Sequence, residues 1–180
     1  MSANFALIFW GLLLVFLNFR IDHVDILPDF VGYILVAVGC SRLSGASRCF
    51  PTARSLSCVL VLFDVLSYAL SGSAATSFNL LERIVHCTMM WFLLGGLMEL
   101  AQAQHRTDLS DRASRYRAAY VVAMCLATLA GLLAQSSRYS VGEVGTVLAI
   151  CILAALFLVL FLIFHLIYRF KHEVGKGYVA

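Results

Sequence analysis

Long uncharged stretches separated by short polar segments dominate the pattern of this chain. With histidine counted as neutral, they cover residues 1–19, 30–41, 84–98, 118–137 and 144–168, and only Asp64 interrupts 55–81. A helix needs about 20 mostly apolar residues to cross the hydrocarbon core of a bilayer, where backbone groups must pair within the segment. The pattern therefore predicts six transmembrane helices. Their expected positions are near 3–20, 26–44, 54–71, 79–102, 117–136 and 145–168.

These helices predict an all-α, polytopic membrane helix bundle arranged as three hairpins. It would form a single integral membrane domain over residues 1–180, with a tail at 169–180. The second helix has an uncharged run of only 12 residues, which rises only about 18 Å. A re-entrant hairpin is the alternative there. The first run lacks the basic start and the cleavage site of a signal peptide, so we expect it to remain a helix of the mature chain.

The composition agrees with lipid as the solvent of this chain. Of its 180 residues, 62% are hydrophobic and 13% are charged, whereas soluble domains carry about 25% charged residues. A globule of this size has too much surface for its volume to bury so many apolar side chains. The net charge is only +3 and the basic residues are scattered, so we expect no nucleic-acid partner.

Lysine and arginine residues fall mostly on one side of the predicted bundle. Ten of the 13 lie in the loops after the second and fourth helices or in the tail, namely Arg42, Arg48, Arg54, Arg106, Arg112, Arg115, Arg117, Arg169, Lys171 and Lys176. The other three are Arg20, Arg83 and Arg138. Basic residues accumulate on the cytoplasmic side of membrane proteins. We therefore expect a plasma (inner) membrane protein with both termini cytoplasmic.

The segment "IDHVDILPDFVGY", residues 21–33, places Asp22, His23, Asp25 and Asp29 on the predicted outer face. One interpretation is the start of the second helix. Asp25 could cap its first N–H groups, Pro28 suits its first turn, and the charge of Asp29 would favour the helix dipole. The alternatives are an interaction surface, or a cation or proton site built from aspartate and histidine.

Gly32 and Gly39 lie seven residues apart, on one face of the second helix, and predict close packing against a neighbouring helix. The segment "DILPDFVGYIL", after a first helix ending in "FLNFRI", resembles the N-terminal hairpin of small multi-pass bacterial membrane proteins of unknown function. Those proteins carry an "LPDxxGY"-like segment at this place. The resemblance covers residues 5–43 and implies a bacterial plasma membrane, without implying an activity.

Asp64 is the only charged residue inside the third apolar run. A charge at the bilayer centre costs about 2.5–3.5 kcal/mol on insertion scales, so such groups usually face the bundle interior and find a partner. Hairpin geometry places Asp64 and His86 at nearly the same depth, with Arg83 able to reach inward from above. This intramembrane polar cluster predicts either a structural clamp between two helices or a proton or ion relay.

No catalytic motif is present. The chain has no G-x-S-x-G, no H-E-x-x-H and no phosphate-binding glycine loop. We therefore expect no enzymatic activity, no cofactor and no metal. The favoured function is a scaffold or accessory subunit that packs against itself or another membrane protein. The alternative is a small transporter or channel with an outward-facing polar path at Asp64, Arg83 and His86.

Overall fold

The computed structural model describes residues 2–17, 20–21, 24–25, 29–67, 73–136 and 143–173, which form six helices and one short ladder. The helices are α1 (Ser2–Leu17), α2 (Asp29–Arg42), α3 (Cys49–Ser67), α4 (Ser73–Ala103), α5 (Thr107–Ser136) and α6 (Glu143–Glu173). β1 (Arg20–Ile21) and β2 (Val24–Asp25) pair antiparallel, with Arg20 opposite Asp25. Apart from this ladder the described chain is all-α, which confirms the predicted class.

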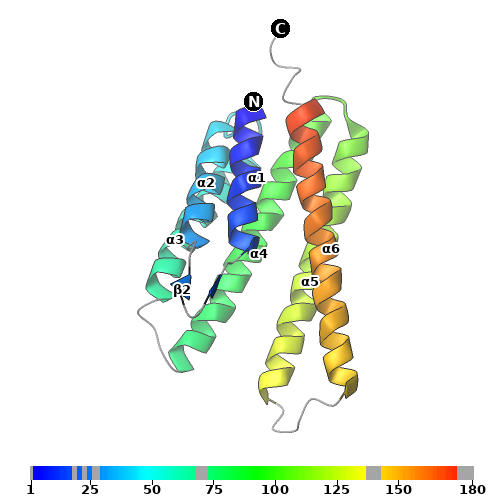
Figure 1. Ribbon diagram of the computed structural model, residues 1–180. Helices are drawn as coiled ribbons and strands as arrows, with labels where there is room; N and C mark the ends of the chain where they lie inside the picture. The colour runs from blue at the N-terminus through cyan, green and yellow to red at the C-terminus, as the bar shows by residue number, and fades with distance from the viewer. Residues whose placement is uncertain are drawn as a thin grey trace.

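Each helix packs against the next one along the chain, and α1 also packs against α6. The start of α1 and the end of α6 lie at the same end of the bundle (Figure 1). We call the half of the bundle next to these two helix ends the terminal half and the opposite half the distal half. The sequential packing agrees with antiparallel neighbours joined by short connections.

Within the part of the chain that the structure describes, three helices are long and apolar enough to cross a membrane. They are α3 over Cys49–Ser67, α4 over Phe78–Ala103 and α6 over Val147–Glu173. A shorter apolar helix covers Ala3–Phe16 in α1. Only 17% of the apolar window of α6 is buried inside the bundle, so most of this helix presents its side chains outward.

Several helices extend beyond their predicted bounds. α5 begins at Thr107, ten residues earlier than predicted, and includes most of the polar segment that precedes the fifth apolar run. α3 begins five residues early, at Cys49, with Pro51 in its first turn, where a missing N–H is tolerated. Hydropathy marks only the apolar part of a helix, whereas arginine, glutamine and alanine continue it well into a polar region. α2 is one continuous helix from Asp29 to Arg42, so the re-entrant hairpin was wrong there.

The α1–α2 contact depends on glycine. A Cβ atom on Gly32 would lie 2.6 Å from the carbonyl oxygen of Gly11, and one on Gly11 would lie 2.7 Å from that of Gly32. A Cβ atom on Gly39 would lie 2.6 Å from the side chain of Ile8. Gly32 and Gly39 thus lie at a close helix contact, and Gly11 is the partner that the sequence pattern did not identify.

The hydrophobic core fills the terminal half. Its fully buried side chains include Phe5, Ile8, Phe50, Met89, Met90, Leu93, Leu94, Leu97, Leu109, Ile167 and Phe170. They come from the start of α1, the start of α3, the second half of α4, the start of α5 and the end of α6. The helices are therefore held together mainly at this end.

Candidate functional site: a polar cavity in the distal half

A cavity of about 310 Å³ lies among α2, α3 and α4 in the distal half, and one residue of α5 completes its wall. Its lining is Asp29, Tyr33, Asp64, Ser67, Asn79, Glu82, Arg83, His86 and Met124. All of these except Met124 are polar. The cavity is therefore lined by ionisable side chains from three different helices.

Helical spacing explains why these residues face one cavity. On α4 the lining residues are Asn79, Glu82, Arg83 and His86, which recur at intervals of three and four. Residues three and four apart share a helix face. The other lining residues follow the same rule. Asp64 and Ser67 of α3 are three residues apart, and Asp29 and Tyr33 of α2 are four apart. Three polar faces therefore meet in the interior.

Asp64 contacts the beginning of α2. Its Oδ2 accepts a hydrogen bond of 2.9 Å from the backbone N–H of Phe30, and its side chain is buried. The first N–H groups of a helix have no intrahelical acceptor, and a negative charge is favoured there. Hairpin geometry predicts a partner for Asp64 on α4, whereas this hydrogen bond comes from α2. Asp64 thus caps a neighbouring helix while lining the cavity.

His86 forms the floor of the cavity. Its Nδ1 and the Tyr33 hydroxyl are hydrogen-bonded at 2.9 Å, and both residues are buried. The His86 ring packs edge-on against Phe16, with ring centroids 5.6 Å apart, and lies 6.4 Å from the Tyr120 ring. Among the described residues, His86 Nε2 and the Tyr120 hydroxyl have no hydrogen-bond partner. The floor therefore retains unused hydrogen-bonding capacity.

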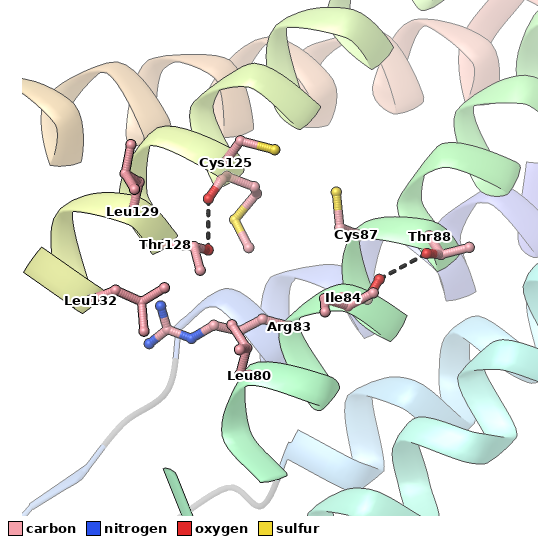
Figure 2. A pocket seen from close by; sticks show the side chains of 10 residues that line it. Leu80, Arg83, Ile84, Cys87, Thr88, Cys125, Thr128, Leu129 and Leu132 are labelled. Atoms are coloured by element: carbon pink, nitrogen blue, oxygen red, sulfur yellow. Dashed lines mark hydrogen bonds between the residues drawn. The ribbon is translucent and has the colours of Figure 1, made fainter. Parts of the chain in front are cut away.

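Arg83 lies at the rim of the cavity. Its side chain is exposed and makes no ion pair within 4.0 Å with any residue that the structure describes. The side chain extends beside Leu132 of α5 (Figure 2). The structure thus brings the predicted residues Asp64, Arg83 and His86 to one cavity, but Arg83 does not reach inward to pair with Asp64.

The predicted outer-loop cluster lies only partly within the described residues. Asp22 and His23 lie outside the described residues, and for Asp25 only its place in β2 is described. Asp29 begins α2 and lines the cavity. Within the described ranges, no group of three or more histidine, cysteine, aspartate or glutamate side chains could hold a metal ion.

Five lining residues were not among the predicted site residues, namely Tyr33, Ser67, Asn79, Glu82 and Met124. Tyr33 lies four residues after Asp29, and this spacing places both on one helix face. Glu82 lies four residues before His86 and could have been found by the same rule. Glu82 makes no hydrogen bond or ion pair with a described residue.

Polar groups of the terminal half contact one another away from any polar cavity. Glu99 of α4 accepts hydrogen bonds from the Ser47 hydroxyl at 2.6 Å and from the Cys49 thiol at 3.3 Å. The Arg117 guanidinium stacks on the Trp91 ring, 3.4 Å from its centroid. These contacts tie the α2–α3 connection to α4 and tie α4 to α5.

A second group of ion pairs joins the α4–α5 turn to the end of α6. Arg106 pairs with Asp108 at 3.2 Å and also with Glu173, which in turn pairs with Arg169 at 2.7 Å. The hydrogen bond from Arg106 lowers the pKa of the exposed Asp108 carboxyl. This network stabilises the terminal end of the bundle.

Comparisons of the chain with protein-family models, curated proteins and solved structures found no match.

Proposed function

We propose that this chain is an integral membrane protein with six transmembrane helices, and that the polar cavity is an outward-facing binding site of a small transporter. The position of the cavity carries the proposal. It lies in the distal half, away from the two helix ends that the excess of lysine and arginine assigns to the cytoplasm. A polar cavity at this place opens toward the outside.

The charges of the lining favour a solute with a cationic group. Glu82 lines the cavity with a carboxyl group that makes no ion pair with a described residue. Ionisable groups within membrane helices are costly and mark substrate or ion pathways when they face a water-filled space. Eight polar residues around one cavity are more than a single interhelical clamp requires.

The floor of the cavity is the natural place for a gate. Below the hydrogen-bonded Tyr33 and His86, the fully buried Met89 and Met90 begin the hydrophobic core. The path from the cavity therefore ends at packed side chains. Transporters expose a central site to each side in turn by moving groups of helices against each other. Separation of the Tyr33 and His86 side chains would be the first step of such a movement.

A scaffold or accessory subunit is the second candidate, and the outward face of α6 favours it. Its exposed side chains include Val147, Leu148, Ile150, Leu153, Phe157, Leu158 and Phe161. Such a face suits lipid, a second copy of this chain or another membrane protein equally well. The two candidates differ in one property, because only the transporter needs a cavity filled with water.

Thiol labelling from outside intact cells tests this difference. Single cysteines replace Asp64 or Glu82 in a chain whose six native cysteines have been substituted, and a membrane-impermeant reagent is added. Ser57→Cys is the matched control, because Ser57 is fully buried on the same helix as Asp64, about 10 Å deeper. We expect labelling at 64 and 82 but not at 57. Protection of all three positions would contradict the transporter and favour the scaffold.

A further inference from the structure

A second cavity, mostly apolar, lies beside the polar one. This cleft has a volume of about 420 Å³ and separates α4 from α5 in the distal half (Figure 2). Ten residues line it, namely Leu80, Arg83, Ile84, Cys87, Thr88, Met124, Cys125, Thr128, Leu129 and Leu132. Ile84, Leu129 and Leu132 are exposed, so the cleft opens to the outer surface of the bundle.

The polar groups of the cleft are already satisfied within their own helices. The Thr88 hydroxyl donates a hydrogen bond of 2.8 Å to the carbonyl oxygen of Ile84, and the Thr128 hydroxyl donates one of 2.8 Å to that of Met124. This bonding to the preceding turn is usual for threonine in membrane helices. Among the residues that line the cleft, only Arg83 is ionised and can bind a polar group of a ligand.

Arg83 and Met124 line both the cleft and the polar cavity. Glu82 faces the cavity, and neighbouring residues on a helix point about 100° apart. A carboxylate that lines the cavity is therefore followed along α4 by a guanidinium that lines both spaces. Neither makes an ion pair with a described residue, so both can bind a ligand.

The depth of Arg83 suits a phospholipid. Arg83 lies five residues from Phe78, where the apolar span of α4 begins, which corresponds to about 7.5 Å. A long arginine side chain at this depth extends toward the polar headgroups of the bilayer. A guanidinium at this level can reach lipid phosphates, and pairs of arginine with phosphate are frequently bidentate.

We propose that the cleft and the cavity form one binding site for an aminophospholipid of the outer leaflet. Its phosphate binds Arg83, its ammonium group enters the polar cavity beside Glu82, and one acyl chain occupies the cleft between α4 and α5. The inference rests on the proposed function, since it specifies the cationic solute of the cavity as a lipid headgroup.

Native mass spectrometry of the detergent-purified chain tests the site with three lipids of identical acyl chains. The headgroup of phosphatidylethanolamine has an ammonium group with N–H donors. That of phosphatidylcholine has a quaternary ammonium group without N–H donors, and that of phosphatidylglycerol has no amine. We expect phosphatidylethanolamine to be retained about tenfold more than phosphatidylglycerol, the factor of one charge-assisted hydrogen bond. Glu82→Gln should abolish this preference, and Arg83→Gln should lower retention of all three lipids.

Filling the cleft provides a second test, which does not depend on charge. Leu129→Trp should reduce retention of phosphatidylethanolamine, whereas Leu126→Trp, three residues away, exposed and outside the cleft, should not. Soluble phosphoethanolamine in excess should fail to displace the lipid, since it lacks the acyl chain.

Three results would overturn the lipid proposal. They are equal retention of the three lipids, retention unchanged by Leu129→Trp, or displacement by phosphoethanolamine. If one of them occurred while cysteines at 64 and 82 still reacted with aqueous reagent, only the lipid assignment would fail and the polar binding site would stand. If the lipid tests failed and the cysteines at 64 and 82 were also protected from the aqueous reagent, the proposed function would fail as well.

Discussion

The two halves of the bundle use polar and small residues in opposite ways. In the terminal half, charged side chains pair with one another, as Arg106 does with Asp108, and the space between helices is filled by the core. In the distal half, ionisable side chains surround a cavity, and α4 and α5 leave a cleft between them. Paired charges stabilise a structure, whereas Glu82 and Arg83, which make no ion pair with a described residue, can bind a ligand.

Glycine explains part of this difference. Gly11 and Gly32 allow α1 and α2 to touch backbone to backbone, and the Phe50 ring lies 2.9 Å from where a Cβ atom of Gly96 would stand. Gly131, in the distal half of α5, has nothing within 4 Å of its Cβ position. A glycine therefore permits a close helix contact only where another helix approaches it, and none approaches the Cβ position of Gly131.

The same substitution at two glycines gives the largest expected contrast. Gly32→Ala places a methyl group against a backbone oxygen that cannot move away, and we expect a loss of about 3 kcal/mol in the free energy of unfolding. Gly131→Ala should be neutral or stabilise by about 0.5–1 kcal/mol, because alanine favours the helix. Unfolding titrations in mixed detergent micelles measure both. Equal effects would show that α1 and α2 do not touch at Gly32.

Removal of the Tyr33 hydroxyl probes the floor of the cavity. Tyr33→Phe leaves a buried nitrogen of His86 without its partner, and we expect a loss of about 1–3 kcal/mol. Tyr116→Phe on α5 is the control, because Tyr116 is less buried and makes no hydrogen bond among the described residues. The same unfolding titration applies. A loss at Tyr116 as large as that at Tyr33 would mean that the bond to His86 contributes nothing.

A bulky residue should be tolerated in the cleft but not in the core. Leu129→Trp enters an open space, so its unfolding free energy should change by no more than about 0.5 kcal/mol. Leu93→Trp, at a fully buried site of α4, should lose about 1–3 kcal/mol by overpacking. Thermal unfolding in the same detergent compares the two. A large loss at Leu129 would indicate that no cleft exists there.

The ion pairs of the terminal half should give the smallest effect, with a defined pH dependence. The pKa of Asp108 is lowered in the folded chain, chiefly by the hydrogen bond from Arg106. Its contribution is therefore complete above the ordinary aspartate pKa and is lost as the pH falls through the folded value. We expect Asp108→Asn to unfold at a slightly lower temperature than the natural chain at neutral pH. The difference should vanish in acid, and a difference that grew in acid would contradict the assignment.

The sequence carries enough information for the helices and for part of the site. Apolar runs determine the number and order of the helices, since each run must be buried or face lipid. Hairpin geometry placed Asp64 and His86 at a similar depth, and both line the cavity. Gly32 and Gly39 could be assigned to a packing face from their spacing alone.

The remaining features depend on how the helices rotate and diverge. The hydrogen bond from Phe30 to Asp64 joins residues 34 apart in sequence and requires α2 to start beside α3. The cleft exists because α4 and α5 separate toward the distal end, which no residue pattern specifies. Hairpin geometry allows Arg83 to reach inward, whereas the open cleft beside it lets the guanidinium reach outward.

Hydroxyl-radical footprinting of the natural chain in lipid nanodiscs tests the central claim most directly. It compares two methionines, Met124 on the wall of the cavity and Met90 in the core of the terminal half. If water fills the distal cavity and stops at its floor, Met124 is oxidised and Met90 is protected. Protection of both methionines, or oxidation of both to the same extent, would contradict a bundle that is open at one end and sealed at the other.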